Sequence, residues 1–278
     1  MATAPPFAGR HRRAALILPE PPDDEEKWSY VWRSLPYLAG ALVFSSFCVV
    51  VAQAWFEVRN PAALPFAVYT FLYFVYQAIS VPMNFAGASF DLAENDELVT
   101  RWQPASYPSV DIFLPICGEP MEVLRNTWAG VFELIQEYPG DALAYVLDDG
   151  PSEEARLLAP SFGFGYVRRP YLRHRKKAGN LNYAFAHTNG EHIVIFDADF
   201  CPRADFLAEL LPYMADPDVG LVQSPQFFRV HQEQTWVEQG AGASLEVFYR
   251  AAQVSRDRFG SALCVGSNAV YRREALEC

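Results

Sequence analysis

The sequence predicts an α/β domain with a mostly parallel sheet, preceded by two helices that cross a membrane. From residue 110 onward, short strand-like runs alternate with helical patterns, as in parallel sheets covered by helices on both faces. Two long uncharged apolar runs precede this alternation. One strand-like run, residues 192–197, ends in Asp-x-Asp. Ligands of such folds lie beyond the carboxyl ends of the strands.

Composition limits the partners and the compartment. The 278 residues carry a formal net charge of −11, which argues against nucleic acid as a partner because a phosphate backbone requires a basic surface. The five cysteines are scattered, without Cys-x-x-Cys or Cys/His ligand spacing. We therefore expect neither a zinc site nor a disulfide framework, and a reducing cytoplasm fits this pattern.

The N-terminal part predicts a tail followed by a membrane hairpin. Residues 1–28 are rich in proline and charge, which predicts a disordered tail. Within residues 29–85, the runs 35–56 and 62–85 contain no charged side chain, and each is about as long as a membrane span requires, roughly 20 residues. A transmembrane hairpin is therefore predicted, with buried helices of a soluble domain as the alternative.

The orientation of the hairpin follows from its basic residues. Five arginines and lysines precede the first span, whereas the connection between the spans carries only Arg59. By the positive-inside rule, the N-terminus and everything after residue 85 are expected on the cytoplasmic side of the cell (inner) membrane. Residues 86–109 are polar and interrupted by prolines, so we expect a linker there.

Each later element has a local signal. The strand-like runs are short and bounded by residues that favour turns, and the helical segments repeat apolar residues every three to four positions. Pro120 suits the first turn of a helix, and Ser152 suits an N-cap. The predicted strands are 110–114, 142–147, 165–168, 192–197 and 219–223. The predicted helices are 121–138, 152–158, 179–187, 202–214 and 236–258.

Acidic residues follow three of the predicted strands. The first strand leads to Glu119, the second ends at Asp148-Asp149, and the fourth ends at Asp197-Ala198-Asp199. Residues two apart in a strand point to the same face, so Asp197 and Asp199 are suited to a hard divalent cation that also binds phosphate. The alternative is an ordinary turn, where aspartate is also common.

A basic run, residues 173–177, leads into Gly179 at the start of a predicted helix. Amide dipoles and an ammonium group there favour a phosphate, so we expect Lys177 to contact one and the other four to be solvated. One edge of the sheet would then carry acidic residues for a metal and a lysine for a phosphate. This combination fits the binding of a nucleoside diphosphate that carries a leaving group. The glycine fingerprint of dinucleotide-binding folds is absent from the sequence, which argues against a dehydrogenase.

Six motifs follow one another along the chain. Their order and content resemble the processive family 2 glycosyltransferases, and most closely the N-terminal portion of the catalytic subunit of bacterial cellulose synthase. The resemblance extends from residue 110 to the C-terminus. The motifs occupy residues 114–120, 147–150, 177–182, 196–199, 222–228 and 265–273.

The resemblance implies a GT-A (Rossmann-like) nucleotide-sugar-binding domain over residues 110–278, with a UDP-sugar donor and Mg²⁺ or Mn²⁺. Within it, Asp197 and Asp199 are implied to support the metal. The implied donor-binding residues are Ile116, Glu119, Asp148, Asp149, Lys177, Gly179, Asn180 and Asp197. The implied acceptor-binding residues are Gln223, Gln226, Phe227, Gly266, Ser267 and Asn268.

The implied reaction is an inverting transfer of a sugar, with glucose as the expected unit, to a growing β-linked polysaccharide, with an accessory export subunit as a further partner. A carboxylate base activates the acceptor in such chemistry. In this family a Thr-Glu-Asp motif supplies the base, and it and a Gln-x-x-Arg-Trp motif follow the position of Arg273. Neither occurs before Cys278, so the chain is expected to be C-terminally incomplete, binding donor and metal without efficient transfer.

Several alternatives stay open. Phe200 stands where these synthases often have histidine, and Val265 stands where they tend to have cysteine, so the polymer need not be cellulose. A chitin, hyaluronan or mannan synthase is a sister hypothesis, and a non-catalytic UDP-sugar-binding fragment is another. A phosphatase with an aspartate nucleophile is disfavoured, because Phe200-Cys201-Pro202 replaces its expected threonine or serine.

Overall fold

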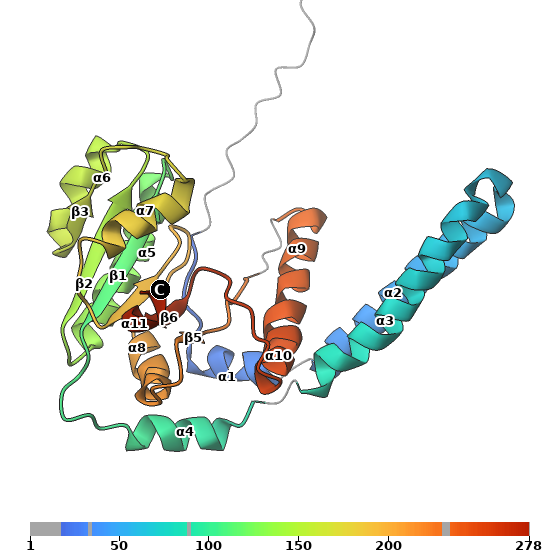
Figure 1. Ribbon diagram of the computed structural model, residues 1–278, viewed down its shortest axis with the longest axis horizontal. Helices are drawn as coiled ribbons and strands as arrows, with labels where there is room; N and C mark the ends of the chain where they lie inside the picture. Colours follow the sequence, from blue (N-terminus) through green and yellow to red (C-terminus); the bar gives the residue numbers. More distant parts are fainter. Residues whose placement is uncertain (1–17, 33–34, 88–89, 230–233, 278) are drawn as a thin grey trace, which may run out of the picture.

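A six-stranded mixed sheet forms the centre of the C-terminal part of the chain (Figure 1), in the order β3-β2-β1-β4-β6-β5. The computed structural model describes residues 18–32, 35–87, 90–229 and 234–277. The strands are β1 (Val110–Ile116), β2 (Ala142–Asp148), β3 (Gly165–Val167), β4 (His192–Ile195), β5 (Leu221–Gln223) and β6 (Ala269–Arg272).

The sheet is parallel on one side and antiparallel on the other. β1 pairs in parallel with β2 and with β4, and β2 pairs in parallel with β3. β6, which the sequence did not predict, lies antiparallel between β4 and β5. The prediction of five strands is therefore met with shifted ends, and the sixth strand makes the sheet mixed.

Helices cover both faces of the sheet, and the apolar residues of β1 divide between two cores. Val110, Ile112 and Leu114 pack in one core with helix α5, whereas Phe113 belongs to a second core with helix α7. All seven residues of β1 are buried, as expected for a central parallel strand. The helices of this domain are α5 (Met121–Glu137), α6 (Glu153–Leu158), α7 (Lys176–Phe185), α8 (Phe206–Leu210) and α11 (Arg273–Leu276), with 3₁₀ turns at Ala159–Phe162 and Leu211–Ala215.

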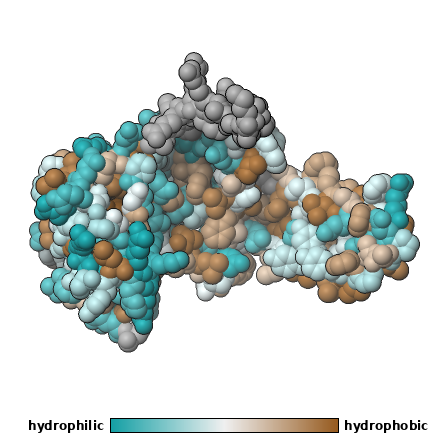
Figure 2. All heavy atoms as spheres, turned by 90° about the horizontal axis from the view of Figure 1, so that it is seen from above, coloured by the Kyte–Doolittle hydropathy of each residue, from teal (hydrophilic) through white to brown (hydrophobic). Residues whose placement is uncertain are grey.

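The hairpin extends away from the sheet as two long helices lying side by side (Figure 1). They are α2 (Leu35–Arg59) and α3 (Ala67–Ala86), joined by a 3₁₀ turn over Pro61–Phe66. Residues 39–59 and 61–86 are long and apolar enough to cross a membrane, judged by length and composition. On the face shown in Figure 2, the hairpin carries apolar and near-neutral side chains along most of its length, whereas hydrophilic side chains predominate over the α/β domain.

Polar contacts tie the hairpin helices together. Glu57 is buried and accepts a hydrogen bond from Thr70 Oγ1 at 2.5 Å. Gln77 Nε2 donates to Ser46 Oγ at 3.0 Å. Such contacts between apolar helices hold one register, because a polar group left alone in an apolar medium is costly.

The predicted helix 236–258 forms as one long segment of three consecutive pieces. They are α9 (Trp236–Val247), a π-helical turn (Phe248–Gln253) and α10 (Val254–Arg258). α9 begins with a capping box, in which Thr235 and Glu238 exchange hydrogen bonds. The predicted linker 86–109 contains a further helix, α4 (Leu92–Arg101), whose N-cap Asp91 accepts from the Glu94 amide.

The prediction of a disordered tail through residue 28 is wrong for residues 18–28, whereas residues 1–17 lie outside the described residues. Helix α1 (Asp24–Trp32) forms there. Its charges meet opposite charges far along the chain: Lys27 Nζ lies 3.0 Å from Asp205 Oδ2 and 2.7 Å from Glu209 Oε1. Composition alone does not reveal ion pairs between residues this far apart in the sequence.

Candidate functional site

The loops that follow β1, β2 and β4 meet at one edge of the sheet. Ile116, the last residue of β1, is in register with Asp148, the last residue of β2. The two following loops pack directly, since a Cβ at Gly150 would lie 2.8 Å from backbone atoms of Cys117 and Gly118. Only glycine permits this approach. The loops that carry Glu119 and Asp148 therefore lie side by side at this edge.

Asp148 is fully buried and hydrogen-bonded within the protein. It accepts from the amides of Gly150 and Ser152 at 2.7 and 2.6 Å and from Tyr166 Oη at 2.6 Å. Burial, and then the bond to Asp148, raise the pKa of the Tyr166 hydroxyl. Asp148 therefore shapes the loop after β2.

Glu119 and Ile116 lie at the same edge but are differently placed. Glu119 is half-buried, and its Oε2 accepts from the amide of Cys117 at 2.6 Å. The Ile116 side chain is buried in the core under the sheet, and its carbonyl accepts from the Asp149 amide at 2.9 Å. Of the two, the Glu119 carboxylate is the one that a ligand can reach.

Asp149 pairs with Arg169, a residue that sequence reasoning missed. Arg169 Nε and Nη2 donate to the two carboxylate oxygens at 2.7 and 2.5 Å, and both side chains are almost fully buried. The hydrogen bond from Arg169 lowers the pKa of the Asp149 carboxyl. In the sequence Arg169 is one of many arginines near a basic run, and no pattern separates it from Arg168.

Lys177 and Asp197 form an ion pair at the centre of the edge. Lys177 Nζ also donates to the carbonyl of Gly266 at 3.0 Å. The amide of Asp197 donates to Ser267 Oγ at 3.0 Å. Both charged side chains stay accessible, at 40% and 36% exposure, so a ligand can reach them. The structure thus brings together three of the six motifs.

Asp199 is exposed, and the residue between the two acids is buried. β4 ends at Ile195, so the acids follow the strand instead of ending it. The alternation persists because Thr127 Oγ1 donates to the Ala198 carbonyl at 2.7 Å and holds that residue inward.

The two acids suit a magnesium or manganese ion that keeps other ligands. Among the described residues, no group of three or more His, Cys, Asp or Glu side chains is arranged to hold a metal ion. Mg²⁺ is commonly held by one or two carboxylates together with water and substrate phosphate. Asp197 and Asp199 supply that smaller donor set, and it fits a metal that arrives with a phosphate.

Gly179 and Asn180 support the edge from beneath. A Cβ at Gly179 would overlap the carbonyl oxygen of His174 and the guanidinium of Arg169. Asn180 is 1% exposed, and its amide donates to the Leu147 carbonyl at 2.8 Å. These two predicted donor-binding residues fix the start of α7 against β2, and the buried Asn180 Oδ1 has no hydrogen-bond partner among the described residues.

The predicted acceptor residues divide into two sets. Gln223, Phe227 and Asn268 line a hollow of about 860 Å³, together with Asp199. Gln226 and Ser267 are buried, and the Gly266 carbonyl faces Lys177. Backbone bonds join this side to the sheet: the Asn268 amide donates to the Ile195 carbonyl at 2.8 Å.

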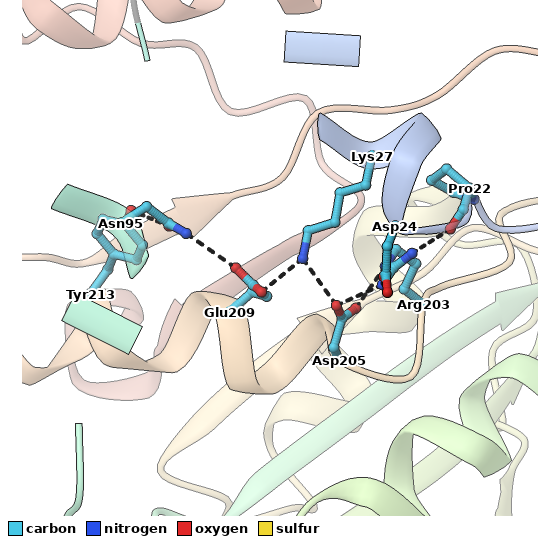
Figure 3. A network of polar contacts seen from close by, with 8 residues as sticks. All are labelled: Pro22, Asp24, Lys27, Asn95, Arg203, Asp205, Glu209 and Tyr213. Atoms are coloured by element: carbon cyan, nitrogen blue, oxygen red, sulfur yellow. Dashed lines mark hydrogen bonds and ion pairs between the residues drawn. The ribbon is translucent and has the colours of Figure 1, made fainter. Parts of the chain in front are cut away.

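Residues 18–22, together with Lys27 and Trp28, form part of the wall of this hollow. Figure 3 shows how they are held: Lys27 reaches Asp205 and Glu209 of the α8 region, and Arg203 reaches Asp24. In addition, Arg229 donates to both carboxylate oxygens of Glu26 at 2.9 and 2.8 Å. The sequence predicted none of these contacts.

The chain thus has a mixed α/β sheet with carboxylates and a lysine at its carboxyl edge, where ligands of such sheets bind. The family model described as Glycosyl transferase family 2 matches residues 111–278, and the chain belongs to that family.

Curated relatives are bacterial cellulose synthases. The chain is 36% identical over 179 residues to Cellulose synthase 1 catalytic subunit (UDP-forming) of Komagataeibacter xylinus, covering 63% of this chain and 24% of that protein. It is 34% identical over 181 residues to Cellulose synthase catalytic subunit (UDP-forming) of Pseudomonas fluorescens, with 63% and 24% covered. The chain thus spans about a quarter of the length of these relatives. The resemblance predicted from the six motifs is confirmed.

Among solved structures, the chain is similar to a mannosyltransferase from Pyrobaculum calidifontis in complex with GDP-Man and Mn²⁺. The TM-score is 0.45 and the identity 22%, and the match covers 70% of this chain and 55% of that chain.

Proposed function

We propose that this chain carries the donor-binding part of a membrane-bound inverting glycosyltransferase. The enzyme transfers a sugar, with glucose as the first candidate, from a UDP-sugar to a growing β-linked polysaccharide. The observation that carries the proposal is the meeting of Lys177, Asp197 and the Gly266 carbonyl at the carboxyl edge of the sheet. The similarity to UDP-forming cellulose synthases supports UDP as the nucleotide.

The uracil end of the donor is assigned to the loops after β1 and β2. Glu119 presents a half-buried carboxylate there, and Asp148 holds the shape of the loop through three internal hydrogen bonds. A carboxylate in this position accepts from an N–H donor of a base and not from a phosphate, since like charges repel. The base and the diphosphate are therefore expected in opposite parts of the edge.

The diphosphate is assigned to Lys177 and to a metal held by Asp197 and Asp199. Bound there, Mg²⁺ or Mn²⁺ stabilises the negative charge that develops on the leaving diphosphate. Lys177 Nζ contributes a second positive charge from the first turn of α7, where helix amides also favour anions.

The acceptor is assigned to the hollow beside Asp199. Gln223 and Asn268 offer polar groups in its lining. Phe228 and Tyr249 stack there with ring centroids 6.1 Å apart, and aromatic surface with a few polar groups is typical of small-molecule sites. The attacking sugar hydroxyl requires a carboxylate base, and we assign no described residue to that role.

The hairpin is assigned to the membrane, and the GT-A domain to the cytoplasmic side. There the carboxyl edge can bind UDP-sugars from the cytoplasm. An accessory subunit that exports the polymer is part of this proposal. The two apolar helices and the excess of basic residues before the first of them support it.

Competition binding tests the donor assignment. Purified chain in lipid nanodiscs with Mn²⁺ binds radiolabelled UDP, and unlabelled UDP-glucose, UDP-N-acetylglucosamine and GDP-mannose compete for it. We expect both UDP-sugars to displace the label and GDP-mannose to fail at equal concentration. UDP-glucose competing better supports a glucan synthase, and UDP-N-acetylglucosamine competing better supports the chitin or hyaluronan alternative. Preference for GDP-mannose would contradict the proposal.

A further inference from the structure

Arg169 lies beneath the carboxyl edge and binds four acceptors at once. Its guanidinium donates to both oxygens of Asp149, to the carbonyl of His174 and to the carbonyl of Lys176 at 3.2 Å. The side chain is 4% exposed and that of Asp149 6%. A planar guanidinium with five N–H donors can serve a carboxylate and two carbonyls together, which an ammonium cannot do.

These bonds hold a turn with an unusual backbone. Arg173, Arg175 and Lys176 have φ angles of 59°, 56° and 50°, a left-handed conformation that side chains other than glycine disfavour. Such a conformation persists only where surrounding contacts impose it. Here Arg169 binds two carbonyls of the turn, and Asp149 Oδ1 accepts from the Arg173 amide at 3.1 Å.

The turn leads directly into the first turn of α7. Lys176 begins the helix, and Lys177 follows it with its ammonium on Asp197 and Gly266. Gly179 permits the turn to lie against the helix, because a Cβ there would overlap both the His174 carbonyl and Arg169. The placement of Lys177 therefore depends on the Asp149–Arg169 pair behind it.

We propose that Arg169 is a positioning residue for the donor diphosphate: with Asp149 it holds the left-handed turn that sets Lys177 at the phosphate end of the site. Arg169 itself touches neither base nor phosphate. This inference rests on the proposed function of the edge as a UDP-sugar site, and it adds a residue that distinguishes binding of the diphosphate from binding of the nucleoside.

Arg169→Lys tests the proposal, because it keeps the positive charge and removes the planar guanidinium that binds several acceptors at once. The neighbouring Arg168→Lys is the matched control, since Arg168 is exposed. Affinities for UDP and for uridine are measured on the full chain in nanodiscs with Mn²⁺. We expect Arg169→Lys to weaken UDP binding by on the order of tenfold, as for the loss of a charged hydrogen bond. Uridine binding stays unchanged, and Arg168→Lys matches the wild type for both ligands.

A double-mutant cycle with Lys177→Ala asks whether Arg169 acts through Lys177. If it does, Arg169→Lys adds little to the loss already caused by Lys177→Ala. Full additivity of the two losses would overturn the proposal, as would wild-type UDP affinity in Arg169→Lys. A wild-type chain that binds no UDP would instead refute the proposed function.

Two further variants keep the test decisive if Arg169→Lys also loses uridine binding, the sign of a disrupted fold. Asp149→Asn keeps the size of the side chain and removes its charge, and it should weaken UDP but not uridine. Arg175→Gly should restore part of the UDP affinity in the Arg169→Lys background, because glycine adopts a positive φ without strain. Unchanged UDP affinity in Asp149→Asn would overturn the proposal, and so would the absence of any rescue by Arg175→Gly.

Discussion

Asp149 shows how one buried charge is kept ionised. The hydrogen bonds from Arg169 lower the pKa of its carboxyl despite burial. A carboxyl whose pKa is lower in the folded state stabilises the fold above its unfolded pKa of about 3.9. That stabilisation is lost as the pH falls through the folded pKa.

We therefore predict that Asp149→Asn lowers stability most at pH 7, by about 3 kcal/mol, since it leaves the Arg169 charge buried and unpaired. The difference from the wild type should shrink as the pH falls below about 4, because the unfolded wild-type carboxyl then takes up a proton that the folded, Arg169-bonded carboxyl does not. Thermal unfolding followed by circular dichroism between pH 3 and pH 7 measures this. A difference that is independent of pH would contradict the assignment of the ion pair.

Cys201 offers a second test of a single group. Burial raises the pKa of its thiol to about 11, and the thiolate is the reactive form. We predict slow alkylation of Cys201 by iodoacetamide at pH 8, rising about tenfold per pH unit toward pH 11. Mass spectrometry compares it with Cys117, which is exposed. Equal rates for the two thiols at pH 8 would contradict the packing around Cys201.

The individual elements show which parts of the fold are legible in the sequence. β1, β2 and β4 are apolar runs with clear ends, and all three were predicted within a few residues. β6 was missed because its four residues pair antiparallel with strands 45 or more positions away. Helix α1 was missed for a similar reason, since its charges find partners about 180 positions along the chain.

The site divides in the same way. Motif positions indicated that Lys177 and Asp197 belong to one edge, and the structure joins them. Motif positions did not indicate whether a side chain points toward the ligand or into the protein. Asn180 and Ser267 belong to motifs, yet both are only 1% exposed. Arg169 stands in no motif, and its importance comes from contacts with Asp149 and with a turn whose left-handed backbone no composition predicts.

The start of α7 gives a prediction about backbone packing. Gly179→Ala places a methyl group onto the His174 carbonyl, so we expect a loss of about 2 kcal/mol in stability. Gly240→Ala in α9 is the control, because no atom lies within 4 Å of its added Cβ. That change should stabilise the helix by roughly 0.5–1 kcal/mol. Chemical denaturation of both variants compares them, and equal effects would contradict the close approach at Gly179.

The segment 18–32 gives a prediction about docking. Arg203 binds Asp24 and Asp205, so Arg203→Ala should release the segment and raise the rate of tryptic cleavage after Lys27 by roughly tenfold. Arg156→Ala removes an exposed ion pair with Glu153 and should leave the rate unchanged. A rate unaffected by Arg203→Ala would show that the segment is held by other contacts.

The molecule as a whole joins an acidic, water-exposed domain to an apolar hairpin. The predicted orientation places the connection between α2 and α3 on the side of the membrane away from the cytoplasm, and the sheet on the cytoplasmic side. Asn60→Cys should therefore react with a membrane-impermeant maleimide in intact cells, whereas Cys117 should react only after permeabilisation. The opposite labelling pattern would contradict the predicted orientation, because the site would then lie on the other side of the membrane from cytoplasmic UDP-sugars.

The central claim is that the carboxyl edge binds a UDP-sugar diphosphate through Lys177 and a metal held by Asp197 and Asp199. Calorimetric titration of UDP into the full chain, with and without Mg²⁺ or Mn²⁺, tests it most directly, with Asp197→Asn as the variant. The prediction is saturable binding that the metal strengthens in the wild type and does not strengthen in Asp197→Asn. The claim would be contradicted if the metal did not change the UDP affinity of the wild type. It would also be contradicted if the metal strengthened UDP binding in Asp197→Asn as much as in the wild type.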